Sequence, residues 1–113
     1  MKVAVIGGRD FSDEMLLHNT LNPYRKIITT IVSGGAKGAD TLGEQYADLY
    51  FIDKEIYLPN WDLYGKRAGF IRNQLIIEAS DFVLAFWDKK SAGTKSSIGI
   101  AKKLNKPCKI IYY

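Results

Sequence analysis

The stretch "IVSGGAKGAD", Ile31 to Asp40, joins the end of an apolar run to a glycine loop and the start of a polar segment. The residues before and within it, 27–33, are β-branched nearly throughout, which predicts a strand. Three glycines follow within five positions, and residues 39–51 then carry apolar side chains at helical spacing. This junction therefore indicates a strand that enters a helix through a glycine loop.

The same alternation extends over the whole chain. Short apolar runs predict strands, and Pro23 and Pro59 end two of the segments. We expect strands at 2–7, 27–33, 54–58, 81–87 and 108–113, and helices within 12–25, 39–51, 60–80 and 88–105. Ser12 is the expected N-cap of the first helix. Ile71, Leu75 and Ala79 mark the expected inner face of the third helix. Strands that alternate with helices predict a doubly wound, mostly parallel five-stranded Rossmann-like sheet with helices on both faces, an α/β fold.

Length and composition narrow the classes of protein. The 113 residues fit one domain, residues 1–113, and no apolar run approaches the length of a membrane span. Cys108 is the only cysteine, so no intrachain disulfide is possible, and we expect a cytoplasmic protein without a signal peptide. His18 is the only histidine, which argues against a metal site. The net charge of +4 favours anionic ligands without indicating nucleic acid.

The candidate binding residues lie where strands give way to helices. In a doubly wound sheet, ligands bind beyond the carboxyl ends of the strands. Glycine loops expose backbone amides there, and a helix N-terminus favours an anion such as phosphate. Arginine, lysine and threonine side chains can add donors, and an indole can stack on a nucleobase. The predicted ligand-binding residues are Gly8, Arg9, Asp10, Ser33, Gly34, Gly35, Lys37, Gly38, Asp40, Asn60, Trp61, Arg72, Asn73, Trp87, Ser91, Gly93 and Thr94.

Each of these residues also has a purely structural explanation. Loops of α/β proteins carry glycine simply to turn, and the pattern is neither a Walker A loop nor the GxGxxG fingerprint. Trp87 is as well explained by strand packing, and Asp40 by capping of the second helix. The functional interpretation depends on convergence, because four such junctions should fall along one edge of one sheet.

The ordered set "VIGGRDF", "VSGGAKGAD", "NWDLYGKRAGFIRNQ", "DFVLAFWD" and "SAGTKSS" resembles short proteins of the SLOG superfamily of bacteria and their phages. The resemblance covers nearly the whole chain. It implies a Rossmann-like, SLOG-like nucleotide-binding domain. The superfamily includes the Lonely Guy phosphoribohydrolases, the DNA-processing protein that loads recombinase on single strands, and sensors of ADP-ribose derivatives. The resemblance therefore implies a nucleotide or nucleotide-derived ligand.

The chain departs from the phosphoribohydrolases at their PGGxGTxxE stretch. Gly93 and Thr94 match the Gly-Thr pair, but no glutamate follows in 95–98. Breaking an N-glycosidic bond needs a carboxylate, and the catalytic residue is therefore unknown. Asp88 is the best substitute candidate, because it directly follows the fourth strand.

We expect a binding protein that senses, carries or sequesters a small nucleotide-derived ligand, with no cofactor, no metal and no membrane partner. A phage-borne protein of this kind could sequester a host signal. Hydrolysis of nucleoside 5'-monophosphates is the second hypothesis. Single-stranded nucleic-acid binding is third, and we do not expect nucleic acid as a partner, because the basic residues form no stripe in the sequence. We also expect a homo-oligomer, as its relatives often are.

Overall fold

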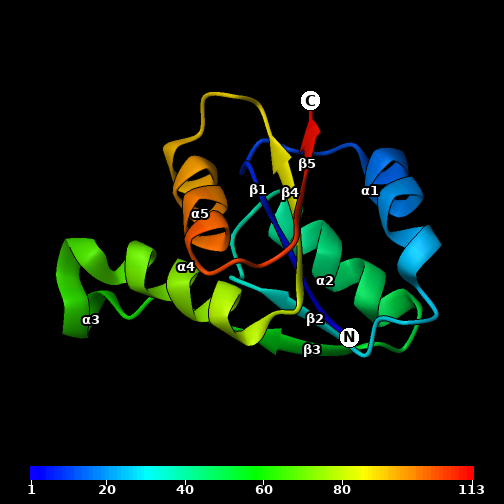
Figure 1. Cartoon of the computed structure of the whole chain (residues 1–113), viewed down its shortest axis with the longest axis horizontal. Coiled ribbons are helices and arrows are strands. Elements are labelled where there is room, and N and C mark those ends of the chain that lie inside the picture. The colour runs from blue at the N-terminus through cyan, green and yellow to red at the C-terminus, as the bar shows by residue number, and fades with distance from the viewer.

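The computed structural model describes residues 1–113 and contains one five-stranded sheet (Figure 1). All strand pairs are parallel, in the order β3-β2-β1-β4-β5. The strands are β1 (Lys2–Gly7), β2 (Thr30–Ser33), β3 (Asp53–Ile56), β4 (Phe82–Trp87) and β5 (Cys108–Tyr112). The helices are α1 (Glu14–Leu21), α2 (Ala39–Leu49), α3 (Trp61–Tyr64), α4 (Ala68–Ala79) and α5 (Ala92–Lys103), with 3-10 turns at Asn22–Tyr24 and Gly65–Arg67. None of these helices combines the length and the apolar character needed to cross a bilayer.

Helices cover both faces of the sheet, as predicted. Helices α1 and α2 lie on one face and α4 and α5 on the other (Figure 1). Because side chains alternate along a strand, Val3 and Val5 of β1 pack toward α1 and α2, whereas Ala4 and Ile6 pack toward α4 and α5. The central strands β1 and β4 have four fully enclosed residues each, which explains their continuous apolar sequences.

Three local predictions differ from the structure. Strand β2 begins at Thr30 and not at residue 27, because the amides of Ile27 and Ile28 donate to the carbonyl of Tyr24 in the preceding turn. The N-cap of α1 is Asp13, whose carboxylate accepts the amide of Leu16, and not Ser12. Helix α4 buries Ala68, Ile76 and Ile77 instead of the face marked by Leu75.

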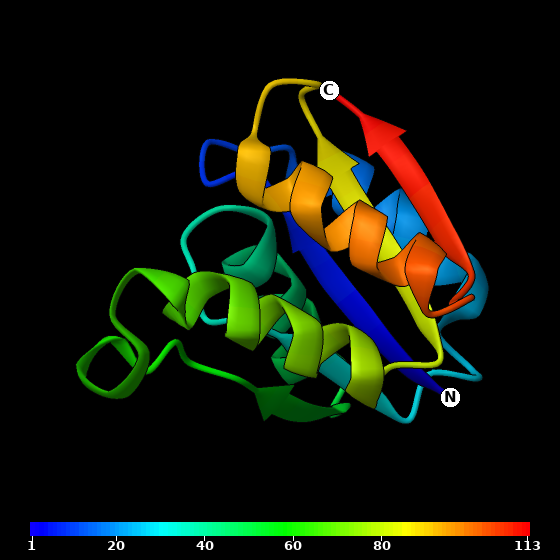
Figure 2. The same cartoon turned by 60° about the vertical axis from the view of Figure 1, so that its left-hand side comes forward.

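Helix α3 projects away from the sheet, beside the start of α4 (Figure 2). It lies between the edge strand β3 and α4, and its four residues are all exposed. The side chain of Asn60 caps it by accepting the amide of Leu63. The connection after β3 therefore forms an arm, while the other three strand-to-helix connections stay on the carboxyl edge.

Close packing of α2 on β1 generates a stability prediction. A Cβ atom at Gly43 would lie 2.7 Å from Cγ1 of Val5, so Gly43→Ala forces the helix off the sheet. We expect a loss of about 1–3 kcal/mol in the free energy of unfolding, measured by urea denaturation. The control is Gly99→Ala on α5, where a Cβ meets nothing within 4 Å. This substitution should raise the free energy of unfolding by about 0.5–1 kcal/mol. Equal effects of the two changes would contradict the packing argument.

Candidate functional site

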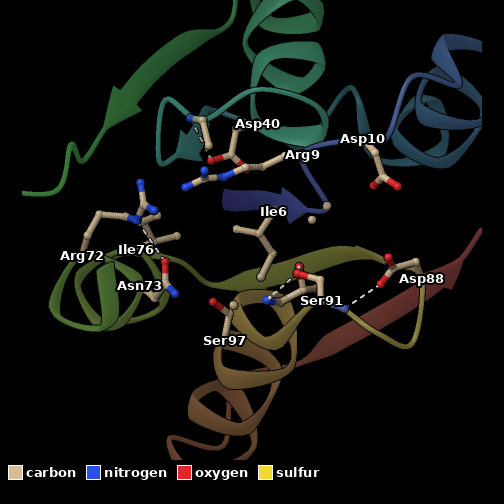
Figure 3. Close-up of a pocket in the computed structure, with 15 residues that line it drawn as sticks. Ile6, Arg9, Asp10, Asp40, Arg72, Asn73, Ile76, Asp88, Ser91 and Ser97 are labelled. Atoms are coloured by element: carbon tan, nitrogen blue, oxygen red, sulfur yellow. Dashed lines mark hydrogen bonds between the residues drawn. The ribbon is translucent and has the colours of Figure 1, made fainter. Parts of the chain in front are cut away.

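A polar cleft lies at the carboxyl ends of β1 and β4 (Figure 3). The chain order of the sheet reverses between these two strands, which is the position where doubly wound sheets bind ligands. The cleft has a volume of about 440 Å³, within the range of small-molecule sites. Its lining residues are Ile6, Gly7, Gly8, Arg9, Asp10, Ala36, Asp40, Arg72, Asn73, Ile76, Asp88, Ser91, Gly93, Thr94 and Ser97.

The carboxylate of Asp40 occupies the glycine loop after β2. Its Oδ2 accepts the amide of Gly34 at 3.2 Å and the amide of Ala36 at 3.3 Å. The N-cap of α2 is Gly38. The structural explanation of Asp40 as the cap of this helix is therefore wrong. Two amides of the loop that we expected to face a phosphate therefore already bind a negative charge of the chain itself.

Arg72 fixes the same loop from the opposite side. Its Nη1 donates to the carbonyl of Gly34 at 2.6 Å, and its Nε donates to Oδ1 of Asn73 at 2.9 Å. A Cβ at Gly34 would lie 2.6 Å from that Nη1 and 2.9 Å from Oδ2 of Asp40. Gly34 is therefore required because two charged side chains close on its backbone, and not because of its dihedral angles.

Gly38 serves a different purpose. Its φ of 82° is unfavourable for other residues, and a Cβ there would meet the carbonyl of Gly8 and lie 2.7 Å from the carbonyl carbon of Arg9. The amide of Ala39 donates to the carbonyl of Gly8 at 3.2 Å. Gly38 thus lets the loop after β2 pack against the loop after β1, which carries Arg9.

Burial raises the pKa of Asp40 to about 6, against the lowering effects of the Ala36 amide, the Arg72 charge and the Gly34 amide. The residue is only 6% exposed. Burial likewise lowers the pKa of Arg72, and the nearby charge of Arg9 acts in the same direction. The charge of Asp40 acts in the opposite direction on the pKa of Arg72. This side of the cleft therefore combines two cations with one buried carboxylate, which favours an anionic ligand.

The N-terminus of α5 forms another wall of the cleft. Ser91 caps the helix by accepting the amide of Thr94. Asp88 accepts the amides of Lys90 and Ser91 at 2.8 and 2.7 Å, and the pKa of its carboxyl is lowered mainly by these bonds. Asp88 thus shapes the loop that precedes α5. Helix geometry leaves the amides of the first helical residues, Ala92 and Gly93, without intrahelical acceptors.

Asp10 is held by the last residue of the chain. The hydroxyl of Tyr113 donates to Oδ1 of Asp10 at 2.6 Å, and its ring packs edge-on against Phe11 at a centroid distance of 4.8 Å. Phe11 in turn packs on Phe86 of β4. These contacts anchor the loop after β1 to the strands beneath it.

The structure brings nine of the seventeen predicted residues to the cleft and leaves eight outside its lining. The nine are Gly8, Arg9, Asp10, Asp40, Arg72, Asn73, Ser91, Gly93 and Thr94, and the catalytic candidate Asp88 joins them. The eight outside are Ser33, Gly34, Gly35, Lys37, Gly38, Asn60, Trp61 and Trp87.

Internal contacts explain four of the eight exceptions, and position explains the other four. The hydroxyl of Ser33 donates to Glu44, and the indole of Trp87 donates to the carbonyl of Ser91. Asn60 and Trp61 belong to the projecting arm. Gly35 and Lys37 are exposed beside the cleft lining. Gly34 and Gly38 shape the loop, as described above.

Sequence reasoning missed five lining residues: Ile6, Gly7, Ala36, Ile76 and Ser97. Ser97 was detectable, because it lies three positions after Thr94 and so on the same face of α5. Ile6 and Ile76 look like core residues in any pattern analysis, and they form the apolar floor. The structure gathers no three histidine, cysteine or carboxylate side chains that could hold a metal ion.

The raised pKa of Asp40 predicts a pH dependence of stability. Between the unfolded value of 3.8 and the folded value of about 6, the folded protein holds the proton more tightly, so stability from this group falls as pH rises. Relative to Asp40→Asn, the native chain should gain about 2 kcal/mol as pH drops from 7 to 4.

Urea denaturation across this pH range measures that difference. The control is Asp62→Asn, an exposed carboxyl on the arm, which should show no such trend. A native-minus-Asn difference that stays constant from pH 7 to 4 would rule out the burial of a charged Asp40.

Comparison with solved structures supports the fold. The chain is similar to DNA processing protein A of Helicobacter pylori, a structure described for its single-stranded DNA binding mode, with a TM-score of 0.78 and 25% identity. It is also similar to DNA processing protein A of Streptococcus pneumoniae, with a TM-score of 0.82 and 18% identity. The alignments cover 97% and 96% of this chain, but only 64% and 49% of those proteins.

The Helicobacter protein corrects one expectation. We did not expect nucleic acid as a partner, because the basic residues form no stripe in the sequence. That expectation was wrong, since a protein with this fold over nearly the whole chain binds single-stranded DNA. Basic residues distant in sequence, such as Arg9 and Arg72, meet at one cleft, so a linear stripe was the wrong criterion.

Sequence comparison identifies the family. The chain is 28% identical over 118 residues to the Gene 61 protein of Mycobacterium phage D29, and the alignment covers 94% of this chain and 92% of the phage protein. Residues 1–64, which include the loops carrying Arg9 and Asp40, match the model of the YspA, cpYpsA-related SLOG family. The chain therefore belongs to the YspA, cpYpsA-related family of the SLOG superfamily.

Proposed function

We propose that this chain binds single-stranded DNA, with a backbone phosphate held in the cleft at the carboxyl edge of the sheet. The observation that carries the proposal is the likeness over 97% of the chain, at 25% identity, to a protein described for that binding. In this proposal residues 1–113 act as one nucleotide-binding domain.

The donors of the cleft suit a phosphodiester. Arg9 is exposed and forms no hydrogen bond or ion pair within the chain, so its guanidinium is free for a ligand. Arg72 lies nearby, and Ser91, Gly93 and Thr94 at the start of α5 line the same cleft. A phosphate here would relieve the repulsion between the two arginines and gain charged hydrogen bonds.

The carboxylates give the cleft a direction. Asp10 and Asp88 lie on one side, whereas Arg9 and Arg72 lie on the other, together with the single buried carboxylate of Asp40 (Figure 3). A phosphate is therefore expected on the arginine side. The free oxygens of the two carboxylates then face groups that donate hydrogen bonds, such as the amino groups of nucleobases.

Arg9→Ala tests the proposal without disturbing the fold, because Arg9 has no internal partner. We expect about tenfold weaker binding of a labelled oligothymidine, measured by fluorescence anisotropy. The slope of log K against log salt should also become shallower by about 0.7. Lys103→Ala, at the exposed far end of α5, is the charge-matched control and should leave both values unchanged. If Arg9→Ala binds the oligothymidine with native affinity, the DNA does not bind in this cleft.

A free nucleotide is the second candidate, and the shape of the cleft favours it. The volume of about 440 Å³ and the floor of Ile6 and Ile76 would accommodate one base and its sugar. Calorimetry with AMP, ADP-ribose, NAD and cyclic nucleotides measures this directly. A nucleotide that binds and competes with the oligonucleotide occupies the same cleft, whereas absence of heat across the panel rejects this candidate.

A further inference from the structure

We propose a second contact for single-stranded nucleic acid at the opposite edge of the sheet, centred on Phe51. It rests on the proposed function and extends it to a surface remote from the cleft. The surface, here called the Phe51 patch, consists of Arg25, Lys26, Ile28, Thr29, Tyr50, Phe51, Ile52 and Asp53.

Phe51 occupies a backbone position that normally takes glycine. Helix α2 ends in a Schellman motif, in which the amide of Ile52 donates to the carbonyl of Ala47 and the amide of Phe51 to the carbonyl of Asp48. Phe51 has a φ of 56°, a left-handed conformation that is unfavourable for a bulky residue. No packing of the side chain compensates for this unfavourable conformation, because the residue is 96% exposed.

The other end of the molecule shows what this motif ordinarily requires. Helix α5 ends in the same pair of hydrogen bonds, from Lys106 to Ala101 and from Asn105 to Lys102. There the left-handed position, with the same φ of 56°, is taken by Asn105, a residue that tolerates it. An exposed phenylalanine at the equivalent position of α2 therefore calls for a function outside the folded chain.

The surroundings of Phe51 indicate the chemistry of its partner. A cleft of about 560 Å³ adjoins it, lined by the end of α2 and the segment before β2. These two segments approach each other near the N label in Figure 1. Arg25 lies over the ring of Tyr50, 4.4 Å from its centroid, and neither Arg25 nor Lys26 forms a salt bridge. Two cations against one carboxylate, Asp53, favour an anionic partner, and the exposed ring offers a stacking surface for a base.

Helix α2 links the two sites. It begins at the glycine loop beside the cleft and ends at the Phe51 patch. Its 11 residues span about 16 Å. A strand of about 16 nucleotides is long enough to contact both sites. A strand of about 3 nucleotides contacts only one, because at a rise of roughly 3.4 Å per nucleotide it is shorter than the distance between the sites.

Anisotropy with oligothymidines of these two lengths tests the inference. The native chain should bind the long strand more tightly than the short one. Phe51→Gly should weaken long-strand binding about tenfold and leave short-strand binding unchanged. Phe51→Trp keeps an aromatic ring and should retain the native affinity for the long strand.

Loss of folding does not confuse this test. Phe51→Gly removes an unfavourable backbone conformation, so its thermal midpoint should rise, by about 4 °C. Asn105→Gly makes the same backbone change at the end of α5 and should bind both strands as the native chain does.

Three results would overturn the inference. Native-like binding by Phe51→Gly, while Arg9→Ala weakens both strands, would reject the patch and keep the cleft. If Phe51→Gly has a different molar mass from the native chain in light scattering but the same DNA affinity, the patch is a contact between two copies of the chain. Absence of any DNA binding by the native protein would reject the patch and the proposed function together.

Discussion

The carboxylate of Asp40 organises the carboxyl edge of the sheet. It binds the amides of the glycine loop after β2, while Arg72 binds a carbonyl of that loop from the other side. Two segments distant in sequence are joined in this way: the glycine loop with the first turn of α2 that follows it, and the second turn of α4. A buried charge is costly, and the raised pKa of Asp40 records that cost. The chain retains the charge where it fixes the shape of the cleft.

This arrangement changes the meaning of the glycines. A glycine loop before a helix is usually taken as an anion site, and here the chain provides the anion itself. The amides of Gly34 and Ala36 are consequently not available to a ligand in this state. The free donors are instead Arg9, held by packing of one loop on another, and the start of α5. The family relationship explains the overall pattern, whereas these contacts determine which groups remain available.

The cleft and the Phe51 patch lie at opposite ends of α2. The cleft combines charged groups with an apolar floor and is partly enclosed, whereas the patch is an exposed ring beside two cations. Such a division suits an extended ligand better than a compact one, because a compact ligand cannot reach both. The same division agrees with the likeness to a protein that binds single strands.

The sequence by itself determined the doubly wound sheet, since apolar runs and helical spacing report how strands and helices are buried. It also placed Arg9, Arg72, Ser91 and Thr94 at one edge, because the carboxyl ends of parallel strands must meet there. Only the tertiary structure decided which amides are free. The amide of Gly34 binds Asp40 in the first turn of α2, and the carbonyl of Gly34 binds Arg72 of α4. The tertiary structure also carried Trp61 away on an arm, because no local pattern specifies the direction in which a connection leaves the sheet. The strained, exposed Phe51 became visible only with its dihedral angle and its lack of packing, both of which are properties of the folded chain.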